Sequence, residues 1–126
     1  MNSSLIPIVL TFDENYVLPA GVAMHSLMHH ANPNYIYEFN IIHHGISEVQ
    51  QYLLIENLKF FQNQNVKFIY CNQSFENIFN QLKNPSHFSQ EMFYKLILPS
   101  LLPQYDKVIV SDVDVIFKGD ISSVYQ

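Results

Sequence analysis

Short and almost uninterrupted apolar runs recur along the chain, and each is followed by polar residues or glycine. The run LIPIVLTF spans residues 5–12, YIYEFNIIHH residues 35–44 and VKFIYC residues 66–71. A fourth run, KVIVSD, spans residues 107–112, and VIF at 115–117 continues it after a break. Continuous runs rich in β-branched residues are typical of strands covered on both faces, so we expect four strands here.

Four segments carry helical patterns, at residues 20–32, 47–63, 74–82 and 90–102. The first is rich in alanine, methionine and leucine, and we expect it to stop near Pro33, because the residue before a proline disfavours helix. The second begins with Ser47 and Gln50, which form a capping-box pattern at a helix start. Strands that alternate with helices predict an α/β fold around a mainly parallel sheet with right-handed crossovers.

The composition is that of one folded domain rather than a disordered chain. Of the 126 residues, 48% are apolar and 13% are charged, which favours a sizeable buried core. All 6 basic residues are lysines, and the formal net charge is −5. This balance leaves no basic patch for a nucleic-acid backbone, and an anionic ligand would need a metal ion to offset the repulsion.

The single cysteine and the two ends of the chain indicate in which compartment the protein works and whether the chain is a fragment. Cys71 stands alone, so we expect no internal disulfide and no thiolate zinc cluster. The first residues lack a basic segment before their apolar run, which argues against a signal peptide or membrane span and favours the cytoplasm. The last residues, ISSVYQ, resemble the first turn of a helix, so we expect a fragment of a longer chain.

Two acidic clusters follow predicted strands. Asp13 and Asn15 flank Glu14 after the first strand, and Asp112 and Asp114 flank a valine after the fourth. Ligands of open α/β sheets bind beyond the carboxyl ends of the strands. Residues i and i+2 of an extended segment point to the same side, so the two later aspartates can converge on one divalent cation. The alternative is a solvated turn whose aspartates cap backbone amides.

The order of three blocks resembles the family 8 glycosyltransferases, which are retaining enzymes of the GT-A fold. The blocks are IPIVLTFDENY, then NIIHHGIS, then FYKLILPSLLPQYDKVIVSDVDVIFKGDISSVY. The family includes enzymes of lipopolysaccharide biosynthesis that transfer galactose or glucose, and the glycogenins. The resemblance implies that residues 1–126 are the N-terminal UDP-sugar-binding part of a GT-A domain. It also implies a Rossmann-like, mainly parallel sheet with helices on both faces.

The resemblance assigns the first acidic cluster to the nucleotide. Thr11, Asp13 and Asn15 would edge the uridine pocket, with Asp13 as the carboxylate that contacts the base. Tyr16 would lie in the same block toward the sugar and the acceptor. The donor implied is a UDP-hexose, and the acceptor is a saccharide or a lipid-linked glycan. Association with the inner face of the membrane would come from a part of the protein after residue 126.

The second cluster is assigned to a metal ion, manganese or magnesium. Asp112 would contact both the ribose and the metal, and Asp114 would be the main protein ligand, with a histidine from the C-terminal half completing the site. Bound there, the ion would act as a Lewis acid on the leaving UDP. Lys95 stands where the family commonly has a catalytic arginine, and lysine keeps the charge but lacks the planar fork.

Three other classes of protein stay open from the residues alone. A receiver domain would need an aspartate at the end of the third strand, where Tyr70 and Cys71 stand instead. A haloacid-dehalogenase-like phosphotransferase would place its D-x-D at the first strand. A non-catalytic binder would keep the donor pocket alone. His25 and His29 are spaced to hold zinc on one helix, although a surface helix without metal is the simpler interpretation.

Overall fold

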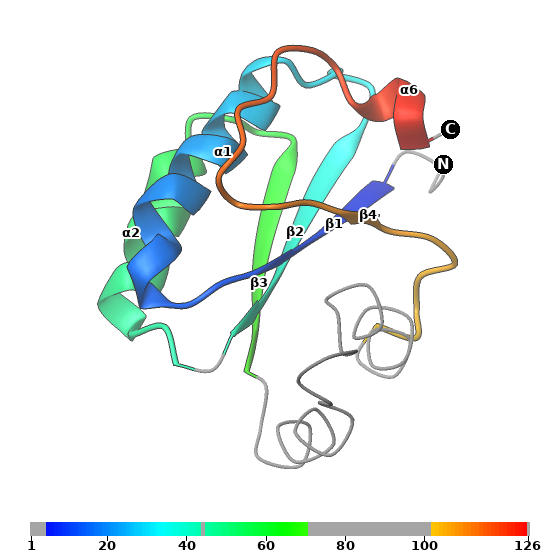
Figure 1. Cartoon of the computed structure of the whole chain (residues 1–126). Coiled ribbons are helices and arrows are strands. Elements are labelled where there is room, and N and C mark those ends of the chain that lie inside the picture. The colour runs from blue at the N-terminus through cyan, green and yellow to red at the C-terminus, as the bar shows by residue number, and fades with distance from the viewer. Residues whose placement is uncertain (1–4, 44, 71–101, 126) are drawn as a thin grey trace, which may run out of the picture. The chain divides into compact units, whose positions relative to one another are not determined.

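The computed structural model describes residues 5–43, 45–70 and 102–125 of the chain. The chain divides into two compact units, one formed by Met1–Tyr70 with Val108–Gln126 and the other by Cys71–Lys107. The first unit contains all the helices and strands described below (Figure 1).

Four parallel strands form one sheet in the first unit. They are β1 (Leu5–Thr11), β2 (Ile36–His43), β3 (Gln64–Tyr70) and β4 (Ile109–Val110), arranged in the order β3-β2-β1-β4. All three pairings are parallel, as the alternation of apolar runs with helices predicted. The expected continuation at residues 115–117 is wrong, because the chain there forms no ladder and is instead held at Phe117, whose N–H bonds to Ser26 Oγ at 2.9 Å.

Two helices connect the first three strands. They are α1 (Val17–His29), preceded by the 3-10 turn η2 (Glu14–Tyr16), and α2 (Glu48–Leu58), while the short α6 (Ser122–Tyr125) comes after β4. The first helix starts three residues earlier than predicted, because η2 leads directly into it. Residues 74–82 and all but the last residue of 90–102 lie outside the described residues. Among the described residues, no helix has the length and apolar character needed to cross a membrane.

The core lies between the sheet and the helices α1 and α2, which pack on the same face (Figure 1). The sheet contributes alternate residues of its two central strands, namely Ile6, Ile8, Leu10, Tyr37, Phe39 and Ile41. The helices contribute Ala20, Met24, Leu27, Leu54 and Leu58. Residues of the central strands that point to the opposite face, such as Val9 and Asn40, are equally buried. The expectation of strands buried on both faces is therefore confirmed for β1 and β2, whereas exposed residues recur along β3.

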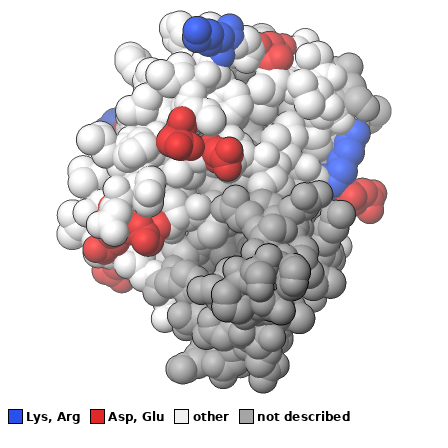
Figure 2. All heavy atoms as spheres, viewed as in Figure 1, with Lys and Arg blue, Asp and Glu red and all other residues white. Residues whose placement is uncertain are grey.

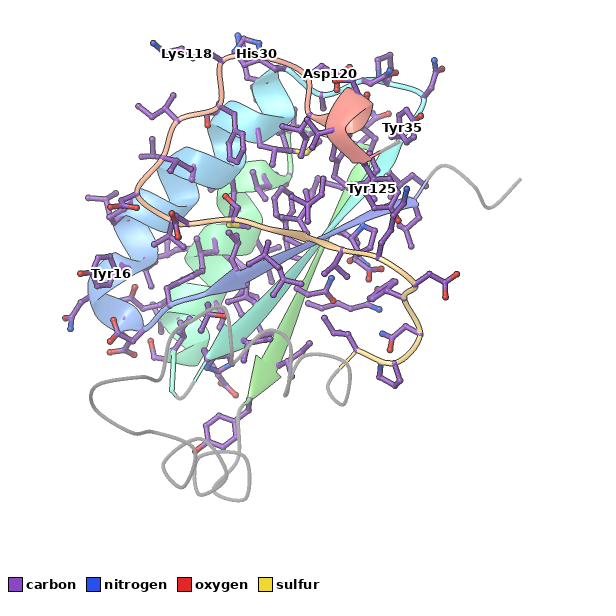
Figure 3. All side chains as sticks on the ribbon, turned by 45° about the vertical axis from the view of Figure 1, so that its right-hand side comes forward. Tyr16, His30, Tyr35, Lys118, Asp120 and Tyr125 are labelled. Atoms are coloured by element: carbon purple, nitrogen blue, oxygen red, sulfur yellow. The ribbon has the colours of Figure 1, made fainter. Side chains whose placement is uncertain are left out.

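A small polar network joins the end of the described chain to β2. The hydroxyl of buried Tyr37 accepts a hydrogen bond from the N–H of Asn32 at 2.9 Å and donates to Asp120 Oδ1 at 3.4 Å. Burial raises the pKa of Tyr37, so the phenol stays protonated and able to donate. The N–H of Ser122 donates to Asp120 Oδ1 at 2.8 Å, at the start of α6 (Figure 3). The bond from Ser122 lowers the pKa of Asp120 below its ordinary 3.8.

Asp120→Asn is expected to lower the melting temperature by a few degrees near pH 6 and by less in acid. Asparagine still accepts the bond from Ser122, so the variant isolates the charge. Because the pKa of Asp120 is depressed by folding, its contribution is present above pH 3.8 and is lost as the pH falls through the lower folded value. Thermal unfolding from pH 6 to pH 2.5 measures this. An undiminished difference at pH 2.5 would contradict the electrostatic explanation.

Candidate active site

The carboxyl ends of β1 and β4 bring the two acidic clusters to the same edge of the sheet. The two strands are parallel neighbours, with Val9 opposite Val110, and the N–H of Ser111 donates to the carbonyl of Val9 at 3.1 Å. Beyond this bond, β1 leads into Asp13 and β4 leads into Asp112. Clusters separated by about a hundred residues in sequence are thus delivered to the edge where α/β proteins bind ligands.

Asp112 and Asp114 lie in the segment that follows β4, where the chain bends at Val113 and Asp114. Val113 between them packs against the core cluster, and both aspartates are exposed. Within the described residues, neither carboxylate accepts a hydrogen bond or forms an ion pair. Acidic side chains stand on a mostly uncharged surface in the space-filling view (Figure 2). Among the described residues, neither carboxylate therefore caps a backbone amide.

The turn after β1 is shaped by its own side chains. Asp13 caps η2, and its Oδ1 accepts a hydrogen bond from the N–H of Asn15 at 3.0 Å. The N–H of Tyr16 donates to the carbonyl of Asp13 at 3.0 Å. The Tyr16 ring is about half exposed and lies on the outside of the turn (Figure 3). One carboxylate oxygen of Asp13 and the amide of Asn15 remain accessible at this edge of the molecule.

Thr11 ends β1 with its hydroxyl buried and without a hydrogen-bond partner among the described residues. Its side chain points to the same face of the sheet as Val9 and Val110, since side chains alternate along a strand. Asp112 follows Val110 by two residues, as Thr11 follows Val9, and the pairing of β1 with β4 ends at Val9 and Val110. A buried hydroxyl costs free energy unless it is paired, which makes Thr11 a candidate contact for a ligand.

Other candidates of the sequence analysis have different outcomes. Lys95 lies outside the described residues. The ring of His25 packs edge-on against Phe61, with 5.1 Å between ring centroids. Across residues 5–43, 45–70 and 102–125, no group of three or more histidine, cysteine, aspartate or glutamate side chains is arranged to hold a metal. The pair formed by His25 and His29 therefore finds no third ligand in that part of the chain.

A groove of about 900 Å³ runs between α1, α2 and residues 116–118. Apolar side chains such as Leu18, Val22 and Leu53 line much of it, and Glu14 and Asn15 border it. None of Asp13, Asp112 and Asp114 belongs to its lining. Although large apolar pockets are common ligand sites, the carboxylates locate the candidate chemistry at the edge of the sheet. The sequence pattern did not predict this groove, because it depends on how distant segments pack.

A parallel sheet with acidic turns at its carboxyl edge defines an α/β protein with the layout that such folds use to bind ligands. More specifically, the chain belongs to glycosyl transferase family 8, whose model matches residues 7–126. The family predicted from the three sequence blocks is thereby confirmed. A search of curated proteins finds no match for this chain.

Solved structures agree with this assignment. The chain is 25% identical to the bifunctional glycosyltransferase WbbM in its apo form, with a TM-score of 0.74. The match covers 98% of this chain and 21% of WbbM. It is also 25% identical to the galactosyltransferase LgtC, whose structure is in complex with donor and acceptor sugar analogues, with a TM-score of 0.75. The match covers 96% of this chain and 42% of LgtC. The chain thus spans less than half of either protein.

The fold alone is shared more widely. Mouse xyloside xylosyltransferase 1 is 16% identical with a TM-score of 0.67, and the match covers 96% of this chain and 46% of that one. The mixed α/β fold with a parallel sheet, predicted as a GT-A fold, is confirmed. The two described connecting helices cover one face, so helices on the other face stay a prediction.

Proposed function

We propose that residues 1–126 are the UDP-sugar-binding part of a retaining glycosyltransferase. The protein would transfer a hexose from a UDP-sugar to a saccharide or a lipid-linked glycan. Family membership and the likeness to a galactosyltransferase support the reaction class. The observation that carries the proposal is the pair of exposed carboxylates of Asp112 and Asp114, which have no partner among the described residues and lie at the same edge of the sheet as the Asp13 turn. A lipid-linked acceptor would place the reaction in the cytoplasm at the inner face of the membrane.

The donor set at this edge fits a divalent cation. Asp112 and Asp114 offer only oxygen atoms, and manganese and magnesium prefer carboxylate, carbonyl and water oxygens. A cation held there would neutralise negative charge on the diphosphate of the donor. Charge supports the same assignment, because a chain with a net charge of −5 repels a diphosphate unless a cation intervenes.

We assign each of the remaining candidate residues to a part of the nucleotide-sugar. One carboxylate oxygen of Asp13 accepts from the N–H of Asn15. We assign the other oxygen to the imide N–H of uracil. The buried hydroxyl of Thr11 has no partner among the described residues, and we assign it to the edge of the uridine pocket. We assign Asn15 to the same uridine pocket, Asp112 to the ribose as well as the cation, and Tyr16 to the side of the transferred sugar and the acceptor.

UDP is expected to bind the full-length protein at least about tenfold more tightly with manganese than with a chelator, a difference of about 1.4 kcal/mol. Isothermal titration calorimetry measures both affinities. Uridine, which lacks the diphosphate, is the matched control, and its affinity should not change with manganese. Equal affinities for UDP under the two conditions would contradict metal-assisted binding, and absent UDP binding would contradict the proposed donor.

A further inference from the structure

Glu14 turns away from the cluster in which the sequence places it. Its Oε1 accepts a hydrogen bond from the backbone N–H of Ser47 at 2.8 Å, across 33 residues of sequence. Ser47 is the N-cap residue of α2, so the carboxylate lies at the start of that helix. Negative charge is favourable there, because the free N–H groups make a helix start electropositive. Glu14 thus joins the turn after β1 to the turn after β2.

This contact replaces one half of the predicted capping box. Ser47 Oγ accepts from the N–H of Gln50 at 3.3 Å, as the pattern predicted. In a complete capping box the Gln50 side chain would also accept from the Ser47 N–H. Here Glu14 accepts that hydrogen bond instead. A link that is normally internal to one helix therefore connects two different turns.

The turn that receives Glu14 is itself well braced. The N–H of buried Ile46 donates to Nδ1 of His43 at 3.0 Å, and its carbonyl accepts from Gln51 Nε2 at 2.8 Å. Both His43 and Ile46 are buried. The start of α2 is therefore a firm anchor, whereas Asp13 and Asn15 sit in an exposed 3-10 turn.

We propose that Glu14 is a positioning residue that anchors the Asp13 turn to the start of α2 and thereby orients Asp13 and Asn15 for the nucleotide. The proposal rests on the proposed function. In this proposal Glu14 acts through its two neighbours and not on the UDP-sugar itself, because its Oε1 accepts from the Ser47 N–H. Since Asp13, Glu14 and Asn15 are consecutive in one turn, releasing the middle residue frees the two on either side. The consequence is weaker donor binding with little change in the chemical step.

Glu14→Ala is expected to raise KM for the UDP-sugar about fivefold while kcat stays within about twofold, as loss of one exposed, charge-assisted hydrogen bond predicts. Glu14→Gln is the conservative control, because its amide oxygen still accepts from Ser47, and it should stay within about twofold of wild type. If kcat and thermal stability fall together in both variants, the role is structural and the proposal is wrong. A wild-type KM in Glu14→Ala also overturns it.

A second pair of variants tests the Ser47 N–H, which donates the hydrogen bond to Glu14. Ser47→Pro removes the N–H, and the φ of −62° at this position suits the proline ring. Ser47→Ala removes the hydroxyl cap but keeps the N–H, so it is the matched control. We expect the proline variant to reproduce the higher KM of Glu14→Ala, and the double variant to be no worse than either alone. Additive effects would overturn the proposed link.

Hydrogen exchange distinguishes a failure of the positioning role of Glu14 from a failure of the proposed function. The Ser47 amide should exchange faster in Glu14→Ala than in wild type and in Glu14→Gln, whether or not a donor binds. Absent UDP binding in the wild type overturns the proposed function and the positioning role together. Faster exchange with unchanged KM, in a wild type that does bind UDP, overturns the positioning role alone.

Discussion

Asp114→Asn is expected to reduce the transferase activity of the full-length protein roughly a hundredfold, because an amide cannot replace a carboxylate that binds a divalent cation. Asp114 is exposed, and its carboxylate has no partner among the described residues, so the substitution breaks no hydrogen bond of the fold. Initial rates at saturating donor, measured over a range of manganese concentrations, test this. The manganese concentration for half-maximal rate should rise at least about tenfold.

Asp106→Asn provides the matched control for this effect. Asp106 is also an exposed aspartate, but it has no assigned role in the site. We expect its activity and manganese dependence to stay near those of wild type. Equal manganese affinity in Asp114→Asn and wild type would show that this carboxylate is not a ligand. A comparable loss in the control would mean that general surface charge, rather than ligation, governs the activity.

Phe39→Ala is expected to lower the free energy of unfolding by about 3–5 kcal/mol, the usual cost of truncating a buried aromatic residue. Phe39 lies in the middle of β2 with 0% of its surface exposed, on the face that packs against α1 and α2. Truncation would leave a cavity between the sheet and the helices. Such a loss is a large part of the total stability of an ordinary domain.

Urea unfolding followed by circular dichroism measures this loss, with Phe60→Ala as the control. Phe60 is 89% exposed, so its truncation should change the unfolding free energy by less than about 0.5 kcal/mol. A loss below about 1 kcal/mol in Phe39→Ala would mean that the neighbouring side chains collapse into the space. The packing around β2 would then be looser than the buried core indicates.

The strands were predictable because their apolar runs are short and bounded by polar residues. The boundaries of the helices were less so. The helix α1 begins at Val17 because Asp13 caps the preceding turn, an effect of one side chain that periodicity does not reveal. The second helix stops at Leu58, where the pattern extended to residue 63, because the N–H of Phe61 turns back to the Leu58 carbonyl. At such helix ends, local hydrogen bonds rather than the weak periodicity of apolar residues decide where the helix begins or stops.

In the site, too, the sequence predicts what depends on neighbouring residues and does not predict contacts between segments that are far apart in the chain. The spacing of Asp112 and Asp114 predicted a shared side on an extended segment, whereas the chain bends at Val113 and Asp114, so the shared side stays a prediction. The contact between Glu14 and Ser47 depends on how two turns meet in space. The capping-box pattern could have drawn attention to Ser47, but no spacing rule links it to Glu14. The sequence pattern likewise does not reveal that the Thr11 hydroxyl is buried without a partner among the described residues.

The pairing of Ile8 with Ile109 has a consequence for the order of folding. The strands β1, β2 and β3 follow one another within residues 5–70, so they can associate early, through short-range contacts. Closing the long loop between β1 and β4 costs more chain entropy, which delays such non-local contacts. During synthesis on the ribosome, we therefore expect β4 to complete the acidic edge after β1, β2 and β3 have paired.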